Sequence, residues 1–534
     1  MKKLPKGIQT FSKIRENNYI YIDKTEDIYN LINNGEIYFL SRPRRFGKSL
    51  LISTMEELFK GNKELFKGLF IYDKWNWEEK YPVIRLDLSN TEHDDPQALK
   101  DSLYDLINIF AKRFKITLKS KTLNLRFKEL IEEIYKKDGK IAILIDEYDK
   151  PIISHLDDID LAQKNRDVLR SFYSILKAND EYLRFLFITG VTKFSKISIF
   201  SDLNHLDDIT IHPKYTTICG YTQRDIEDNF DEYILKIMNN GVVSKEKVLK
   251  RIKDCYNGYS WDGKNLVYNP TSILKLFDTK IFANYWADTG TPKLLKDLIK
   301  NTNIDLEVLA KKKSEFKGSF PNFELDDMDF ATILLQTGYL TIKQTIENPL
   351  KTPIYITGIP NSEVESSFYI YLLNVLTSIK TKNIIPLTKN ILNAIYMKDD
   401  EKIQKSFETL FSKIPNMLWG NIKRLFEDFL KAILFIAIAL MGFDVESEIM
   451  SIKGRLDLIL RQNDLFLIME FKYSEDENIS FDELLKIAGN QIIEKGYYKP
   501  YQNRNVVILT IAFKGRDLKC KFKSLNQALK EYET

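Results

Sequence analysis

A short apolar run that leads into a tight basic loop constrains this chain more than any other feature. Residues Ile37 to Leu40 are consecutive large side chains of the kind found in a buried strand. A loop ending in Gly47-Lys48-Ser49 follows, and apolar residues then return at helical spacing. Strand, loop and helix in this order are the context in which a Gly-Lys-Ser loop binds phosphate. The segment therefore predicts a phosphate-binding loop (P-loop) between a strand and a helix.

The chemistry of such a loop assigns a role to its residues. Backbone N–H groups and the positive end of the helix would hold the phosphates of ATP. Lys48 would reach the β- and γ-phosphates, and the Ser49 hydroxyl would ligate Mg²⁺. The predicted nucleotide-binding residues of this loop are Arg42, Pro43, Arg44, Arg45, Phe46, Gly47, Lys48, Ser49 and Leu50.

One position departs from the usual motif. Arg42 stands where a glycine normally permits a sharp turn and a close approach to the nucleotide. An arginine there could lend charge to the phosphates or contact a neighbouring subunit of a homo-oligomer. The alternative is a basic turn before an ordinary helix. A second motif, which the chemistry of ATP hydrolysis requires, favours the phosphate-binding interpretation.

That second motif is an apolar strand that ends in two carboxylates. Residues Ile141 to Ile145 are apolar without alternation, which predicts a central strand covered on both faces. Asp146 and Glu147 follow, at the edge where α/β sheets bind ligands. Asp146 would hold Mg²⁺ through water, and Glu147 would orient and deprotonate the attacking water.

Thr189 closes another apolar strand and has two interpretations. In ATPases of this architecture the strand beside the acidic one carries a polar group that senses the γ-phosphate, which makes Thr189 a candidate for nucleotide contact. A threonine at a strand end is equally well explained as a structural residue. Both interpretations stay open at this point.

The length and the changing pattern of the chain indicate about three domains, because 534 residues exceed one core. Residues 1–220 alternate strands with amphipathic helices, which predicts a three-layer α/β domain with a mostly parallel sheet, as in P-loop NTPases. Residues 221–350 become helical with aromatic-rich turns and predict a lid, partly winged-helix-like. Residues 351–534 form the third predicted domain, with a helical lead-in.

Composition excludes several classes of protein. The three cysteines are far apart and only four histidines occur, so neither a disulfide framework nor a zinc site is predicted. The net charge of +4 argues neither for nor against nucleic acid. The amino terminus lacks the apolar core of a signal peptide. The most apolar run, 432–443, is far shorter than the ~20 residues of a spanning helix. We expect a buried helix there and a cytoplasmic protein without a membrane partner.

A different chemistry appears near the carboxyl terminus. Two apolar strands separated by a Gln-Asn-Asp turn predict a β-hairpin. Asp457 lies on the first strand, and Glu470 and Lys472 lie on the second, where residues two apart share a face. Asp457 and Glu470 would bind Mg²⁺, which activates a bound water and neutralises charge on a phosphodiester. Lys472 would position that water or stabilise the developing charge.

The opposing interpretation of this hairpin is an exposed strand that carries ordinary surface charges. These charges interrupt strongly apolar strands, however, where an unpaired charge is costly to bury. This favours a metal site, and flanking helices offer Glu427 and Gln491 as auxiliary groups.

With these residues, the chain resembles a prokaryotic family in which an AAA-like ATPase domain is fused to a C-terminal PD-(D/E)XK nuclease-superfamily domain. Motifs that carry the resemblance are Leu40-Ser-Arg-Pro-Arg-Arg-Phe-Gly-Lys-Ser49, Tyr256-Asn-Gly-Tyr259, Leu335-Gln-Thr-Gly-Tyr-Leu340, Ile359-Pro-Asn-Ser-Glu-Val364, Gly454-Arg-Leu-Asp457 and Glu470-Phe-Lys472. In that family an arginine at position 42 is normal. The resemblance implies ATP hydrolysis, a restriction-endonuclease-like α/β domain, DNA cleavage, and a role in genome defence or mobile-element control.

Two hypotheses for function follow. In the first, the nucleotide state of an ATPase gates a Mg²⁺-dependent nuclease that acts on DNA. In the second, the chain is an ATP-switched signalling or scaffold module whose C-terminal domain binds nucleic acid without cutting it. Metal-dependent degradation of DNA separates the two.

Overall fold

The computed structural model of the chain describes most of its length. The described residues are 1–193, 199, 206–238, 243–286, 315–317, 329–347, 352–412, 414, 426–441, 444–451, 454–462, 464–474, 476, 478–515 and 517–532. For 317, 426–429, 431–432, 444–451, 454–458 and 462 the description covers the backbone alone. The chain divides into two compact units, the first made of 1–304 with 313–365 and the second of 305–312 with 366–534.

A parallel sheet forms the centre of the first unit. Its strands are β1 (Ile37–Ser41), β2 (Val83–Asp87), β3 (Ile141–Asp146), β4 (Leu183–Gly190) and β5 (Asp207–Asp208). They lie in the order β2-β3-β4-β1-β5, and every neighbouring pair is parallel. Strand β4 therefore separates the strand before the P-loop from the strand that ends in Asp146. The mostly parallel α/β sheet predicted from the sequence is confirmed.

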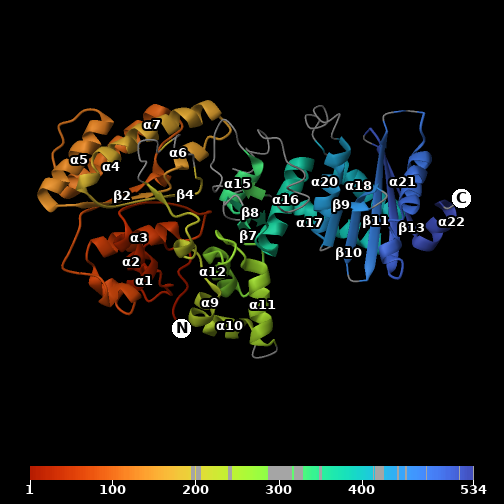
Figure 1. Cartoon of the computed structure of the whole chain (residues 1–534), viewed down its shortest axis with the longest axis horizontal. Helices are drawn as coiled ribbons and strands as arrows, with labels where there is room; N and C mark the ends of the chain where they lie inside the picture. Colours follow the sequence, from red (N-terminus) through yellow and green to blue (C-terminus); the bar gives the residue numbers. More distant parts are fainter. Residues whose placement is uncertain are drawn as a thin grey trace. The chain divides into compact units, whose positions relative to one another are not determined.

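Helices cover both faces of this sheet (Figure 1). The helices on one side are α1 (Phe11–Glu16), α2 (Thr25–Asn34) and α3 (Lys48–Phe59), and those on the other are α4 (Pro96–Phe114), α5 (Leu123–Asp138) and α7 (Ile159–Ala178). The second group shares one large core with β2, β3 and β4. A layered arrangement of this kind places the carboxyl ends of the strands, and the loops that follow them, at one common edge.

A helical segment follows the sheet within the same unit. It contains α9 (Gln223–Asn229), α10 (Asp231–Ile237), α11 (Lys245–Tyr256) and α12 (Pro270–Thr279). These helices bury a core of their own, which also takes in Ile20 and Ile22 from the start of the chain. Helix α15 (Phe330–Thr337) and a small antiparallel sheet of β6 (Glu315–Lys317), β8 (Pro353–Gly358) and β7 (Thr341–Glu347) complete the unit.

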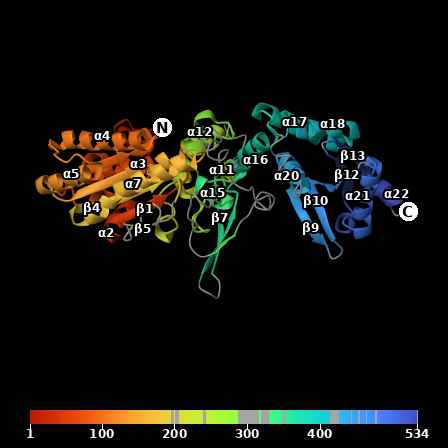
Figure 2. The same ribbon diagram turned by 90° about the horizontal axis from the view of Figure 1, so that it is seen from above.

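The second unit contains a mixed sheet flanked by helices. Its strands are β9 (Asp444–Ser451), β10 (Gly454–Gln462), β11 (Leu465–Ser474), β12 (Asn505–Lys514) and β13 (Asp517–Ser524). Neighbours are antiparallel except β11 and β12, which are parallel and connected through helix α21 (Phe481–Lys495). Helix α21 packs on β11 and β12, and α22 (Leu525–Tyr532) lies beside it (Figure 2). The predicted hairpin is β10 and β11.

Four further helices belong to this part of the chain. They are α16 (Ser362–Thr377), which begins in the first unit, α17 (Thr381–Met397), α18 (Asp400–Phe411) and α20 (Phe426–Ala439). Residues Ile433 to Ile438 of α20 are almost fully buried, so the most apolar run is the buried helix that the sequence predicts. Within the described residues, no helix combines the length and the apolar character needed to cross a bilayer.

Candidate functional site

The P-loop joins β1 to α3 with a left-handed turn. Gly47 has φ +97° and precedes the first residue of α3, Lys48. The Lys48 side chain is buried, and its Nζ donates to the carbonyl oxygens of Arg42 at 2.8 Å and Pro43 at 3.1 Å. Burial lowers the pKa of Lys48, whereas the negative charges of Asp146 and Glu147 act in the opposite direction. The ammonium is thus held under the loop, opposite the two acidic residues.

Asp146 is fixed by a threonine of the neighbouring strand. The Thr189 hydroxyl donates to Asp146 Oδ1 at 3.0 Å, and the Glu147 backbone N–H donates to the same oxygen at 3.1 Å. Both side chains are almost completely buried. This contact exists because β4 lies directly beside β3 in the sheet. The geometry thus adds a role for Thr189 that neither sequence interpretation stated, which is to position Asp146.

Glu147 turns away from the strand toward the cavity. Its φ of +49° is in the left-handed region, which is uncommon for a residue other than glycine and is concentrated at functional sites. Burial raises the pKa of the Glu147 carboxyl above its ordinary value, although the charge of Lys48 opposes that shift. A carboxylate with a raised pKa is better suited to accept a proton than an exposed one.

A cavity of about 380 Å³ lies at the carboxyl edge of the sheet. The predicted residues that line it are Arg44, Arg45, Gly47, Lys48, Ser49, Leu50 and Glu147. Asp146 and Thr189 lie behind this lining as a buried, hydrogen-bonded pair. The Ser49 hydroxyl and the Asp146 carboxylate are the oxygen ligands that Mg²⁺ prefers. The structure therefore brings both halves of the predicted ATP site together.

Several lining residues escaped the sequence prediction. Ile8 comes from the start of the chain, and Tyr221 and Leu274 come from the helical segment. These side chains form an apolar part of the cavity lining. Lys150 adds a cation four residues after Asp146. Its proximity to the acidic motif was a usable signal, whereas nothing local marks Ile8 or Leu274, because distant parts of the chain bring them to the cavity.

The structure does not support the expectation that the Arg42 side chain contacts phosphates or a neighbouring subunit. Its side chain is fully buried, and Nη1 donates to the carbonyl oxygens of Ser41 at 2.8 Å and Thr210 at 2.7 Å. Nη2 reaches the carbonyl oxygen of Tyr215 at 3.3 Å, and the guanidinium lies 3.9 Å from the Trp261 ring centre. Burial lowers the pKa of Arg42 to about 10. The guanidinium is thus neither beside the cavity nor available to another subunit, because interior carbonyls take its donors.

Pro43 and Phe46 also point away from the cavity. Phe46 is buried with its ring edge-on to Tyr259 at 4.8 Å and to Trp261 at 5.4 Å. Of these two loop residues, only the backbone of Pro43 meets a predicted site group, through Lys48.

Asp149 is a buried carboxylate that the sequence interpretation did not single out. Its Oδ2 accepts from the backbone N–H groups of Val191 at 3.0 Å and Thr192 at 2.6 Å, and from the Thr192 hydroxyl at 2.5 Å. Burial raises the pKa of Asp149, and these hydrogen bonds act against that shift. Asp149 therefore fastens the loop after β3 to the end of β4, which keeps Asp146 and Thr189 in register.

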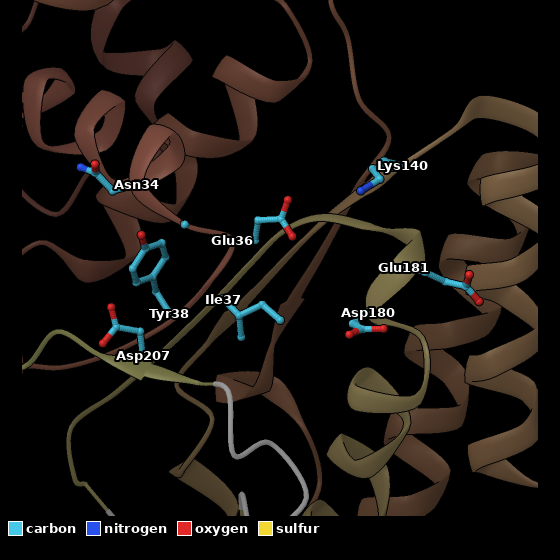
Figure 3. A pocket seen from close by; sticks show the side chains of 9 residues that line it. Asn34, Glu36, Ile37, Tyr38, Lys140, Asp180, Glu181 and Asp207 are labelled. Atoms are coloured by element: carbon cyan, nitrogen blue, oxygen red, sulfur yellow. The ribbon is translucent and has the colours of Figure 1, made fainter.

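A second and larger cavity, about 580 Å³, opens at the opposite edge of the sheet (Figure 3). Residues at the start of β1 and the residue before β3 line it, together with several carboxylates. Parallel α/β sheets bind ligands at the carboxyl ends of their strands, and this cavity lies at the amino ends. The smaller cavity is therefore the candidate nucleotide site.

In the second unit, Glu470 and Lys472 form an ion pair. Lys472 Nζ lies 3.0 Å from Glu470 Oε1, and the Glu470 side chain is only 1% exposed. Both residues share the face of β11 on which Phe466 and Ile468 pack in the core with α21. Gln491 lies on α21, and Thr510 pairs with Glu470 across the parallel strands. A buried carboxylate next to a lysine fits the predicted nuclease constellation.

Asp457 lies on β10, where the structure describes the backbone alone. The antiparallel register ends with Leu458 opposite Met469, and its continuation by one residue places position 457 opposite Glu470. The Asp457 and Glu427 side chains fall outside the described residues, and among described side chains no acidic, histidine and cysteine cluster large enough for a metal occurs.

The folds and sites define two classes of domain: a P-loop ATPase-like domain with a parallel sheet, followed by a nuclease-like domain with a mixed sheet. Comparison with known proteins agrees with this assignment. The family described as "Predicted AAA-ATPase" matches residues 5–200, and the PD-(D/E)XK nuclease superfamily matches residues 425–523.

One relative matches almost end to end. A protein of Azotobacter chroococcum mcd 1, described as an uncharacterized protein in the vnfD 5' region, is 36% identical over 511 residues, which is 94% of each chain. The chain belongs to this family of AAA-ATPase-like proteins with a C-terminal PD-(D/E)XK nuclease-superfamily domain.

Proposed function

We propose that this protein binds and hydrolyses Mg²⁺–ATP at the P-loop, and that its nucleotide state controls a Mg²⁺-dependent DNA nuclease site in the C-terminal domain. The observation that carries the ATPase assignment is that Lys48, Ser49 and Glu147 line one cavity at the carboxyl edge of the sheet. The proposal places the protein in the cytoplasm, in genome defence or the control of mobile elements.

In the ATPase reaction each residue has a defined task. Lys48 exchanges its carbonyl partners for the β- and γ-phosphate oxygens, to which its charge is complementary. Glu147 accepts a proton from a water as that water's oxygen bonds to the γ-phosphorus. The bond from the γ-phosphorus to the bridging oxygen breaks, and ADP leaves. Mg²⁺ held by Ser49 and Asp146 would neutralise charge on the phosphates.

In the nuclease reaction, Asp457 and Glu470 would hold Mg²⁺, which supplies an activated water and neutralises the scissile phosphate. Lys472 is within hydrogen-bonding distance of Glu470, so it would orient the attacking water and stabilise charge on the phosphate oxygens. The water oxygen would bond to phosphorus as its proton passes to solvent. The phosphorus–sugar oxygen bond would break and the leaving oxygen would take a proton from solvent, which leaves a phosphate on one strand end and a hydroxyl on the other.

Paired variants test the two sites separately. Lys48→Ala is expected to abolish ATP turnover measured by phosphate release, whereas Lys74→Ala, an exposed lysine of the same unit, keeps it. Asp457→Ala is expected to spare turnover and abolish plasmid nicking, whereas Asp464→Ala, an exposed residue beside the hairpin turn, spares both.

Two outcomes would overturn parts of this proposal. Normal plasmid nicking by the Asp457→Ala variant would remove the nuclease assignment. Full ATP turnover without any DNA degradation in Mg²⁺ or Mn²⁺ would favour the ATP-switched scaffold whose C-terminal domain binds nucleic acid without cutting it.

A further inference from the structure

Two bulky P-loop side chains, Arg42 and Phe46, pack against a cluster of four aromatic side chains, which we call the aromatic cluster: Tyr259, Trp261, Trp286 and Tyr339. Arg42 stacks on Trp261, and Phe46 meets Tyr259 and Trp261 edge-on. Trp286 lies 5.7 Å from Tyr259 and 6.3 Å from Tyr339 between ring centres. These contacts connect the loop that would bind phosphate to residues up to 300 positions further along the chain.

Gly338 brings this cluster against the P-loop itself. A Cβ added at Gly338 would lie 2.9 Å from Pro43 Cβ and 3.0 Å from the Trp286 ring, so the glycine permits a close approach that no other residue allows. Its φ of +89° further favours glycine. Pro43, whose carbonyl binds Lys48, is therefore in the same packed layer as Trp286.

A buried carboxylate continues this layer to the next helix. Glu363 lies in the first turn of α16 and is 3% exposed. Its Oε1 accepts from the backbone N–H groups of Tyr285 at 2.6 Å and Trp286 at 2.9 Å, and its Oε2 accepts from the Ser272 hydroxyl at 2.9 Å. One side chain thus binds both the Trp286 backbone and helix α12.

Helix α12 also belongs to the nucleotide cavity. Thr271 and Leu274 line that cavity, and Ser272 stands between them on the same helix. A movement of α12 that accommodates nucleotide must displace the Ser272 hydroxyl relative to Glu363, or carry Glu363 with it.

Hydrogen bonds to other parts of the first unit hold the segment just before α16 in place. Asn361 Nδ2 donates to the carbonyl oxygen of Asn257 at 2.8 Å, and Lys343 Nζ donates to that of Pro360 at 2.9 Å. At Gly258 an added Cβ would lie only 2.2 Å from the Pro360 oxygen, so this turn requires glycine. The Asn-Gly-Tyr and Pro-Asn-Ser-Glu motifs therefore form one joint at the root of α16.

Helix α16 is the element that leaves this joint. It runs from Ser362 to Thr377, whereas the first compact unit ends at residue 365 and the second resumes at 366. A continuous helix transmits displacement of its root along its length, because its hydrogen-bonded turns are stiff.

We propose that Glu363 couples the nucleotide site to the C-terminal unit. It ties α12, which lines the cavity, and the backbone of Trp286, whose ring belongs to the aromatic cluster, to the root of the helix that leads into the nuclease domain. This inference rests on the proposed function, since nucleotide in the cavity is the signal. It assigns a function to Arg42, Pro43 and Phe46, which pack the P-loop against the aromatic cluster.

The test is made on the full chain with Mg²⁺ and a non-hydrolysable ATP analogue. Binding of a fluorescent analogue is measured first, and hydrogen–deuterium exchange of the α16 amides 366–377 is then compared with and without the analogue. In the wild type the analogue is expected to change α16 exchange rates about fivefold or more, the usual lower range of coupling between sites.

Two variants interrupt the coupling to different extents. Ser272→Ala removes only the link to α12, and Glu363→Ala removes both links. Both variants are expected to bind the analogue. Ser272→Ala is expected to reduce the exchange response of α16, and Glu363→Ala is expected to abolish it. Glu363→Gln keeps an acceptor for the two backbone N–H groups and is expected to retain a partial response. Glu401→Gln, the same change at an exposed position of α18, serves as the matched control and keeps the full response.

The outcomes separate the two proposals. If the wild type does not bind the analogue, the proposed ATP site fails and the coupling fails with it. If the wild type binds the analogue but α16 exchange does not change, or if Ser272→Ala retains the full response, the coupling through Glu363 is wrong while the ATP site stands. Should Glu363→Ala not fold, Ser272→Ala, which removes a single hydroxyl, still decides the matter.

Discussion

Replacing Arg42 by glycine would restore the ordinary P-loop residue, and we expect it to destabilise the first unit rather than to improve nucleotide binding. The guanidinium is fully buried and donates to three carbonyl oxygens, two of them at 2.8 Å and 2.7 Å. It also stacks on Trp261 at 3.9 Å. Arg42→Gly removes all of these contacts at once and leaves a gap beside the ring.

The size of the effect can be worked from these contacts. A buried carbonyl left without a donor costs about 1–3 kcal/mol, so the two short hydrogen bonds together account for roughly 2–6 kcal/mol. The desolvated stacking contact adds about 2 kcal/mol. The cost of burying the guanidinium, several kcal/mol per ion, disappears in the variant and offsets part of this. We expect a net loss of about 3 kcal/mol.

The assay follows tryptophan fluorescence during thermal unfolding, because four of the five tryptophans (75, 77, 261 and 286) lie in the first unit. An unfolding entropy of about 2.1 cal/mol/K per residue amounts to roughly 0.75 kcal/mol/K for a unit of this size, so a loss of 3 kcal/mol lowers Tm by roughly 4 °C. Arg45→Gly is the matched control in the same loop. Arg45 is exposed and has φ +69°, which glycine adopts without strain, so its Tm is expected to stay within about 2 °C.

Equal melting temperatures for Arg42→Gly, Arg45→Gly and the wild type would refute this reasoning. Tighter ATP binding by the Arg42→Gly variant at unchanged Tm would be a second contradiction, because it would mean that glycine serves the loop better than the buried arginine does.

Three further predictions concern the two sites. Glu147→Gln is expected to keep ATP binding and to lower kcat at least about 100-fold. Burial raises the pKa of Glu147 and the base acts deprotonated, so the wild-type rate should fall with decreasing pH, with a midpoint above the ordinary pKa of 4.5. A midpoint at or below pH 4.5 in the pH–rate profile would contradict this. Thr189→Val removes the hydrogen bond to Asp146 and is expected to weaken Mg²⁺-dependent ATP binding about tenfold, measured by titration, with recovery in Thr189→Ser. EDTA is expected to stop plasmid nicking, and added Mg²⁺ to restore it within the same sample; nicking that persists in EDTA would exclude Asp457 and Glu470 as metal ligands.

Much of the fold follows from local patterns. The apolar run before Gly47-Lys48-Ser49 is strand β1, and the one before Asp146 is strand β3. The hairpin with Glu470 and Lys472 on one face is also local, because it needs only alternation and a turn. Such signals act between residues a few positions apart, so one sequence is enough to detect them.

The strand order is a different matter. Strand β4 lies between β1 and β3, and this order brings the Thr189 hydroxyl to Asp146, 43 positions earlier in the chain. The alternation of strands and helices indicates a parallel sheet but not the order of its strands. The contact of Thr189 with Asp146 therefore could not be predicted before the sheet was known.

By itself, the sequence determined that this protein carries a Gly-Lys-Ser loop between a strand and a helix, a second strand that ends in two acidic residues and a carboxylate–lysine hairpin, because each is a short-range pattern of polarity and turn chemistry. Only the tertiary structure decided that Arg42 lies in the interior, bonded to Thr210 a further 168 positions along, and that Glu363 meets Ser272 and Trp286. The physical reason is that a buried charge is defined by the donors and acceptors that surround it, and in this chain those come from segments far apart in sequence.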